Sequence, residues 1–393
     1  MKRIELLSPA GDLERLKVTL MYGADAVYIG GERYSLRANA NNFSLEEIKE
    51  ACTFAHKLGK KVHLTLNIVF HNEDMEEVED YIKKVVDAGI DAFIVSDPFI
   101  ISYIKENFDV EVNLSTQNST SNYEAIKFFE SEGIDRVVLA RELSKSEIKE
   151  IIDKVNCDIE VFIHGAMCTC FSGRCALSNY VTNRDANRGG CAQVCRFAFK
   201  NEDKKDFTMA LKDMNMADYI GDLIDIGVRS LKVEGRMRSL YYLAVVIGTY
   251  REIIDRYYDN TLDDDAMKIL KERLDRVANR ETSTHYFMKE ADYTDQYFTG
   301  RSEVSNQDYL GQVIEYKDNL LKFYERNYFE VGDLVEVFTP NKDHLEFVVE
   351  ELFDEDMKAC DVARHPDNIY YLKLSCDIEI PEYSMLKIVK RGE

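Results

Sequence analysis

The chain has 393 residues, 45% of them hydrophobic, which allows one large core and a smaller second domain of an ordinary globular protein. Its net charge is −22, with 72 acidic against 50 basic residues, so a surface broadly adapted to nucleic acid is excluded and any RNA contact must be local. No apolar run reaches the roughly 18 residues of a membrane span, and the start MKRIELLSPAGD is typical of a strand and a turn, so we expect a cytoplasmic protein without a membrane segment.

Short apolar strands alternate with amphipathic helical stretches from residue 1 to about 240. The helical stretches, such as SLEEIKEACTFAHKLG, repeat apolar residues at three- and four-residue spacing and end at glycine. Eight parallel strands with intervening helices form a (β/α)8 barrel of the TIM type, which is the fold predicted for residues 1–260. The strand candidates are residues 4–7, 26–30, 62–67, 92–96, 111–116, 136–140, 158–164 and 230–234.

Polar residues gather at the carboxyl ends of these strands. A barrel of this kind places its active site at that face, so we expect the function of the chain to reside there. The residues are Ser8, Asn67, Asp97, Gln117, Arg141, His164 and Arg236.

The interior of the predicted barrel is unusually polar. Residues two apart in a strand share a face, so Glu160, Phe162 and His164 of the seventh strand should point inward. Lys232 and Glu234 of the eighth strand should do the same. Because a buried charge needs a partner, Lys232 should pair with Glu160 or Glu234. The third and fifth strands add His63, Thr65, Asn67, Asn113, Ser115 and Gln117.

Five of the nine cysteines lie between residues 168 and 195, in a long connection that runs from residue 165 to about 213 after the seventh strand. In a reducing compartment, clustered cysteines are metal ligands or catalytic groups more often than disulfides. The spacing C-x-C-x4-C-x15-C-x3-C allows a site of four thiolates with one thiol spare, and it leaves both an iron-sulfur cluster and structural zinc open. This Cys-rich insertion should lie over the barrel mouth. Its cysteines are Cys168, Cys170, Cys175, Cys191 and Cys195.

Basic residues gather in the same connection. Residues 171–200 contain five cations against one acidic residue, Asp185. These cations either contact RNA or offset the negative charge of the clustered thiolates. They are Arg174, Arg184, Arg188, Arg196 and Lys200.

Three further features of the predicted mouth are candidates for catalytic or substrate-binding roles. His164 could be a general acid or base, an outer partner of the metal site, or a structural histidine. The run KVEGR at 232–236 could bind an anionic substrate, with Arg236 clamping a carboxylate, or form a structural ion network. The loop GGERYSLRANANNF after the second strand places Arg37 over the same face, to contact a carboxylate or a flipped base, or to form a solvated loop tip.

The pattern changes after residue 260. An acidic helical stretch continues to about residue 280, and residues 261–300 are predicted to be a helical linker. Short strands separated by turn signals follow, which predicts a small antiparallel β-barrel domain over residues 301–393. No internal repeat is evident in the chain.

Several long motifs resemble those of the collagenase-like peptidases of unknown catalytic type, family 32 of the peptidase clan U. The resemblance spans residues 1 to about 260, and the C-terminal part is similar to the small β-barrel of the shorter members. The motifs are EVFIHGAMC followed by SGRC, SPAGD at the start, STQNS, LARELS, ANRGGCAQVCR and LKVEGRM.

Despite the family's label, this resemblance implies oxygen insertion. Members include tRNA hydroxylation proteins that make 5-hydroxyuridine at the wobble position with prephenate, an rRNA cytidine hydroxylation protein, and subunits for oxygen-independent ubiquinone hydroxylation. The length and the single C-terminal barrel resemble the tRNA type. The resemblance also implies a four-iron, four-sulfur cluster (4Fe-4S), with Cys170 set aside, on Cys168, Cys175, Cys191 and Cys195.

The implied function is prephenate-dependent hydroxylation of a tRNA uridine. Because the negative charge fits poorly with one chain binding tRNA alone, a paralogous subunit is an expected partner. Two alternatives stay open: a peptidase, although H-E-x-x-H and G-x-S-x-G are absent, and a hydroxylase subunit for a small aromatic or quinone precursor. The expected roles are catalytic for His164, Glu160, Lys232 and Glu234, substrate-binding for Arg37, Asn67, Gln117, Arg141 and Arg236, and RNA-binding for Arg174, Arg184, Arg188 and Arg196.

Overall fold

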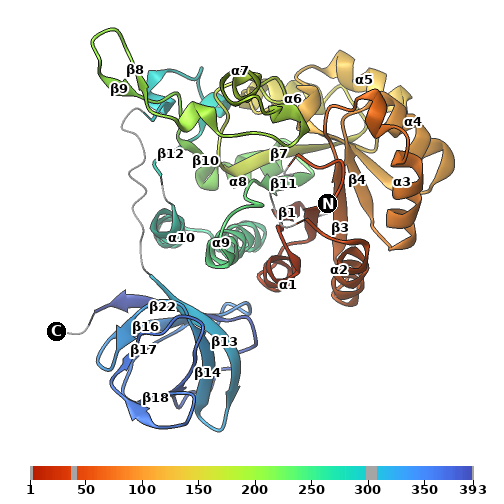
Figure 1. Cartoon of the computed structure of the whole chain (residues 1–393). Helices are drawn as coiled ribbons and strands as arrows, with labels where there is room; N and C mark the ends of the chain where they lie inside the picture. Colours follow the sequence, from red (N-terminus) through yellow and green to blue (C-terminus); the bar gives the residue numbers. More distant parts are fainter. Residues whose placement is uncertain (1–2, 37–41, 279, 298–307, 392–393) are drawn as a thin grey trace.

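The computed structural model describes residues 3–36, 42–278, 280–297 and 308–391. As predicted, eight parallel strands form a closed barrel, because the seventh of them pairs with the eighth and the eighth pairs with the first (Figure 1). In chain order the strands are β1 (Glu5–Pro9), β2 (Ala26–Gly30), β3 (Lys61–Leu66), β4 (Ala92–Val95), β5 (Glu111–Leu114), β6 (Arg136–Val138), β7 (Asp158–Gly165) and β11 (Ser230–Val233).

Helices cover the outside of the barrel. Capping residues set their starts: Asp12 accepts a backbone N–H at the start of the first helix, and Ser44 and Ser144 form capping boxes at two others. None of the described helices is both long enough and apolar enough to cross a membrane. The helices are α1 (Leu13–Met21), α2 (Leu45–Lys57), α3 (Val78–Asp87), α4 (Pro98–Asn107), α5 (Tyr123–Ser131), α6 (Lys145–Ile152), α8 (Ile220–Asp225), α9 (Leu240–Tyr258) and α10 (Asp264–Val277), which packs on α9.

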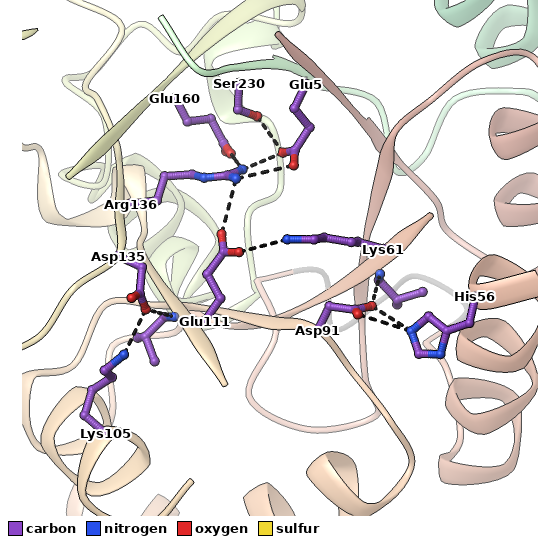
Figure 2. Close-up of polar contacts among 12 residues, drawn as sticks. Glu5, His56, Lys61, Asp91, Lys105, Glu111, Asp135, Arg136, Glu160 and Ser230 are labelled. Atoms are coloured by element: carbon purple, nitrogen blue, oxygen red, sulfur yellow. Dashed lines mark hydrogen bonds and ion pairs between the residues drawn. The ribbon is translucent and has the colours of Figure 1, made fainter. Parts of the chain in front are cut away.

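A short internal repeat, which the sequence analysis missed, joins the amino ends of the strands. Glycine, an apolar residue and aspartate precede β2, β4 and β6, and each aspartate accepts a backbone N–H from the preceding odd strand. Asp91, for example, accepts from Val62 N at 2.7 Å and lies 3.0 Å from the His56 ring (Figure 2). Because this end of the barrel is opposite the mouth, the repeat serves stability. The three aspartates are Asp25, Asp91 and Asp135.

The Cys-rich insertion begins where β7 ends. Strand β10 (Asp213–Asn215) ends the insertion by pairing antiparallel with the last residues of β7, and it pairs parallel with β12 (Thr282–Ser283). Both ends of the insertion are therefore held beside β7. Its other elements are α7 (Leu177–Thr182), the 3-10 turns η3 (Ala186–Arg188) and η4 (Val194–Arg196), and the hairpin of β8 (Phe199–Lys200) and β9 (Asp206–Phe207). The described 3-10 turns outside the insertion are η1 (Asn72–Asp74), η2 (Thr116–Asn118), η5 (Ala217–Tyr219), η6 (His285–Phe287) and η7 (Tyr293–Asp295).

The C-terminal part is an antiparallel sheet of eight strands that curves into a half-barrel with its own core (Figure 1). It docks on the first domain through Phe338, whose ring stacks on Tyr22 at 5.4 Å while the Tyr22 hydroxyl donates to the Phe338 carbonyl at 2.8 Å. The strands are β13 (Tyr309–Lys317), β14 (Leu320–Glu325), β16 (Leu334–Phe338), β17 (Leu345–Val348), β18 (Leu352–Phe353), β19 (Ala359–Cys360), β21 (Ile369–Lys373) and β22 (Met385–Lys390), beside a separate pair of β15 (Phe329–Glu330) and β20 (Val362–Ala363).

In the wild type, the partly buried Val112 N–H donates to Asp135 Oδ2 at 2.7 Å. Replacing Asp135 by alanine removes this acceptor and should lower the free energy of unfolding by about 1 to 3 kcal/mol. Urea titration followed by circular dichroism measures the change. The control is Asp153→Ala, which removes a carboxylate paired with exposed Lys149 and should cost less than about 0.5 kcal/mol. Equal losses in the two variants would contradict a structural role for the repeat.

Candidate functional site

A cavity of about 180 Å³ lies over the carboxyl ends of the barrel strands, enclosed by the Cys-rich insertion. Two glycines allow the insertion to lie this close. Gly165 has φ +108°, and a Cβ there would be 2.3 Å from the Glu234 carbonyl oxygen; Gly173 has φ +74°, and its Cβ would be 2.1 Å from the Gln117 carbonyl oxygen. Strand ends and insertion therefore form one site. Its polar lining includes Asn67, Gln117, Arg141, Lys232, Glu234 and Arg236.

All five cysteines of the insertion line this cavity. They influence one another: burial and the neighbouring Cys175 raise the pKa of the Cys170 thiol to about 11, and burial with the charge of Cys168 raises the pKa of Cys195. Metal binding would therefore release protons from these thiols. Cys170 lines the cavity together with the other four, so this geometry alone does not select four ligands from five.

Among the residues that the structure describes, no group of three or more Cys, His, Asp or Glu side chains is placed to hold one metal ion. Tetrahedral zinc would bring four sulfurs to about 2.3 Å from one centre, whereas each thiolate of a four-iron cluster binds a different iron, so its sulfurs lie farther apart. The cysteines around the cavity supply the all-thiolate donor set that either kind of site requires.

A buried ion network forms the floor below the cavity. As predicted, Lys232 pairs with Glu160, with its Nζ 2.7 Å from Oε1. Glu160 is fully buried beneath the cavity and also binds Arg136 at 3.0 Å. Burial alone would raise the pKa of Glu160, but the charges of Lys232 and Arg136 hold it below its ordinary value. Arg136 binds Glu5 and Glu111 on its other side, so the network spans the barrel (Figure 2).

Arg136 was not among the predicted site residues. A signal was present, because Arg136 is a charged residue within a predicted barrel strand, where a buried charge needs a carboxylate partner. Its side chain is 5% exposed. The positions of its partners, which come from three other strands, could not be read from the sequence.

The predicted substrate-binding residues meet at the cavity, except Arg37, which lies outside the described residues. Arg141 donates from Nη1 to the Ala166 carbonyl at 2.7 Å, and its guanidinium lies 3.9 Å from the centre of the Phe162 ring. Arg236 donates to Ser35 Oγ at 2.7 Å and is buried. Both guanidiniums are thus oriented by protein partners at the cavity wall.

His164 does not point into the barrel, so that prediction is wrong. The pairing of β7 with β11 shifts by one residue, so Phe162 lies opposite Lys232 but His164 lies opposite Val233. The irregularity turns His164 outward, because one extra residue exchanges the two faces of a strand. Its ring is buried beside α9, with Nδ1 3.1 Å from the Tyr250 hydroxyl, and burial lowers its pKa to about 4. His164 is therefore a neutral structural residue that holds β7 against α9.

The predicted RNA-binding arginines fall into two groups. Arg174 and Arg184 are exposed on the insertion. Arg188 binds Glu73 and Asp74, so its charge is neutralised within the protein. Arg196 is partly buried and donates to Gln193 Oε1 at 2.9 Å. The four residues do not form one surface patch of free cations.

These features define a (β/α)8-barrel protein whose catalytic-end cavity is closed by a cysteine-rich insertion. The chain belongs to peptidase family U32: the family model matches residues 11–297, and the model of the family's C-terminal domain matches residues 305–387.

Relatives of the chain carry names that refer to two different activities, tRNA hydroxylation and collagen cleavage. The chain is 44% identical to tRNA hydroxylation protein P1 of Bacillus subtilis, over 95% of this chain and 92% of the relative. It is 32% identical to tRNA hydroxylation protein P of Escherichia coli, over 99% and 97%. It is also 34% identical to a collagenase of Porphyromonas gingivalis, over 88% and 89%.

The buried His164 should make stability depend on pH. The unfolded chain gains a proton near pH 6.5 that the folded site accepts only near pH 4, so stability is lost as pH falls through this window. Relative to His164→Gln, the wild type should lose about 2 kcal/mol between about pH 7.5 and pH 5, measured by urea unfolding. His365→Gln, at an exposed position, is the matched control. A constant difference between wild type and His164→Gln would contradict the assignment.

Proposed function

We propose that this protein hydroxylates a tRNA uridine at the wobble position to 5-hydroxyuridine, with prephenate as co-substrate and a 4Fe-4S cluster. One observation carries the proposal: the five thiols of the insertion and three cationic side chains of the barrel line the same cavity. The names of the relatives at 44% and 32% identity support the RNA substrate. A paralogous subunit remains a proposed partner.

The barrel residues would bind and orient the co-substrate. Prephenate carries two carboxylates, and Lys232, Arg141 and Arg236 present an ammonium and two guanidiniums to the cavity. Glu160 holds the Lys232 ammonium in place from below at 2.7 Å. Asn67 and Gln117 supply neutral hydrogen-bonding groups on the wall.

Glu234 is the proposed proton acceptor of the site in place of His164. Its carboxylate lines the cavity, 3.9 Å from Arg141 Nη2 and 3.4 Å from the Tyr28 hydroxyl. A carboxylate within reach of a bound ligand can exchange protons with it, whereas His164 lies on the other face of its strand.

Cys168, Cys175, Cys191 and Cys195 are the proposed cluster ligands. When bound, such a cluster supplies one-electron chemistry, or it holds the insertion in position over the cavity. The protein's own part is to keep four thiols at a cavity closed by the insertion.

The peptidase alternative lacks the required constellation. A cysteine nucleophile needs a basic partner, and none of the described residues that line the cavity is a histidine. The only histidine predicted at the mouth, His164, is buried against α9.

A deletion strain tests the reaction. Mass spectrometry of digested tRNA should show loss of 5-hydroxyuridine derivatives, restored by the wild-type gene but not by Lys232→Met, which removes the ammonium at the cavity and leaves Glu160 paired with Arg136. Lys127→Met, on the exposed surface of α5, should restore them fully. An unchanged nucleoside profile in a strain without a paralogue would contradict the RNA substrate and favour a small aromatic one.

Serine variants test the cofactor. Anaerobically purified Cys168→Ser, Cys175→Ser, Cys191→Ser and Cys195→Ser proteins should each lose most of their iron, sulfide and visible absorbance, while Cys170→Ser keeps them. Equal iron loss in Cys170→Ser would show that the ligand set is wrong, and stoichiometric zinc without iron in the wild type would contradict the cluster itself.

A further inference from the structure

We propose that a tight turn at the rim of the cavity, residues 171–174, holds the nucleotide next to the target uridine. The Phe171 ring would stack on the base of this nucleotide, and the Arg174 guanidinium would bind its phosphate. We name residues 171–174 the rim turn. The inference rests on the proposed RNA substrate and adds where the single strand would be held.

Phe171 is exposed to solvent and at the same time part of the cavity. It is 62% exposed, and it lines the cavity beside Cys170. Among the described residues, it is the one exposed large apolar residue that also belongs to the lining; Tyr180 and Phe128, for example, are exposed but do not line the cavity. Exposed apolar side chains are common on protein surfaces. A ring at the edge of a cavity, however, is placed to contact whatever enters it.

Arg174 lies at the other end of the same turn. Its backbone N–H donates to the Phe171 carbonyl at 3.0 Å, which closes the turn. Gly173 has φ +74°, the left-handed conformation that a type II turn requires at its third position. The hydrogen bond brings the two ends of the turn to within about 7 Å of each other. The ring and the guanidinium therefore start from neighbouring points of the backbone.

The rim turn is fixed to the loops that follow the barrel strands. Ser172 N donates to Glu142 Oε1 at 2.9 Å, and the Ser172 carbonyl accepts from the Ser119 hydroxyl. Arg174 Nε donates to Ser119 Oγ at 2.9 Å. A Cβ on Gly173 would be 2.1 Å from the Gln117 carbonyl oxygen, so the backbone packs tightly there. A ring carried by a backbone held in this way loses little freedom on binding, which favours affinity.

The Arg174 guanidinium keeps its charge for a ligand. The residue is exposed, and its Nε hydrogen bond goes to a neutral hydroxyl. Within the part of the chain that the structure describes, it forms no ion pair with a carboxylate, in contrast to Arg188. Glu142, the carboxylate bound to the rim turn, accepts from Ser172 instead. The two terminal nitrogens of Arg174 are thus available as a fork for phosphate oxygens.

A nucleotide of single-stranded RNA offers the two groups that this pair binds, a base with a π face and a phosphate. A protein partner would need a broader apolar patch, whereas the rim turn exposes one ring and one guanidinium. Stacking also gives affinity that salt does not screen, which suits a chain of net charge −22 that repels phosphates. With its neighbour stacked at the rim, the target base could leave its stack and enter the cavity.

Substitutions at the two ends of the rim turn separate stacking from charge. In the anaerobically purified full chain, Phe171→Ala should weaken binding of an unmodified tRNA transcript roughly tenfold and leave the slope of log Kd against log salt unchanged, whereas Phe171→Tyr should bind like the wild type. Arg174→Gln should weaken binding and reduce that slope by about one between about 50 and 200 mM salt, and Arg174→Lys should restore the slope. Fluorescence anisotropy of labelled tRNA measures both quantities.

Two exposed residues away from the cavity provide matched controls. Phe128→Ala removes a ring on α5 that is 57% exposed, and Arg364→Gln removes an exposed arginine of the C-terminal part. Both variants should bind tRNA like the wild type. Affinity for prephenate, measured by calorimetry, should stay unchanged in Phe171→Ala and Arg174→Gln, because neither residue belongs to the cationic wall of the cavity.

Several outcomes would overturn the proposal. Wild-type tRNA affinity in Phe171→Ala would do so, and so would a loss of affinity only in proportion to iron lost from the variant. Weaker prephenate binding with unchanged tRNA binding would assign the ring to the co-substrate instead. A changed assembly state in light scattering, again with unchanged tRNA binding, would assign it to a protein interface. Wild-type protein that binds no tRNA even at low salt would overturn the proposed function itself, and the rim turn with it.

Discussion

The contact on which the site depends is the buried ion pair between Glu160 and Lys232, with Arg136 behind it. The three residues belong to β7, β11 and β6, so the pair joins the strands that close the barrel. A buried pair of this kind stabilises less than its Coulomb energy suggests, but removal of one partner leaves an unpaired charge that costs several kcal/mol. Closure of the barrel and presentation of the Lys232 ammonium are therefore one structural requirement.

The one-residue shift between β7 and β11 has two consequences for the same site. It turns His164 toward α9, where Tyr250 holds it, and it leaves Gly165 as the last residue of β7 beside the Glu234 carbonyl. The chain can then leave the barrel directly over its mouth, and Cys168 follows three residues later. A regular strand would have placed a titratable ring in the cavity and directed the insertion elsewhere.

The strands and the polar lumen were predictable because alternation fixes which residues face inward. His63, Thr65, Asn113 and Ser115 are indeed buried. His164 was mispredicted because one irregular residue reverses alternation without any sign in composition. The sequence also could not show which arginines of the insertion are paired with carboxylates. Arg188 is neutralised by Glu73 and Asp74, which are more than 110 residues away in the chain.

The acidic surface and the cationic mouth have opposite effects on a negatively charged ligand. A net charge of −22 repels a polyanion over most of the protein, and this repulsion is screened beyond roughly 8 to 10 Å at physiological salt. Under the proposed function, RNA would have to be held by positive charge close to the site, and Arg141, Lys232 and Arg236 line the cavity. If the proposed RNA substrate is correct, this charge distribution would disfavour non-specific binding along the RNA and favour contact at the mouth, where the thiols and Lys232 lie.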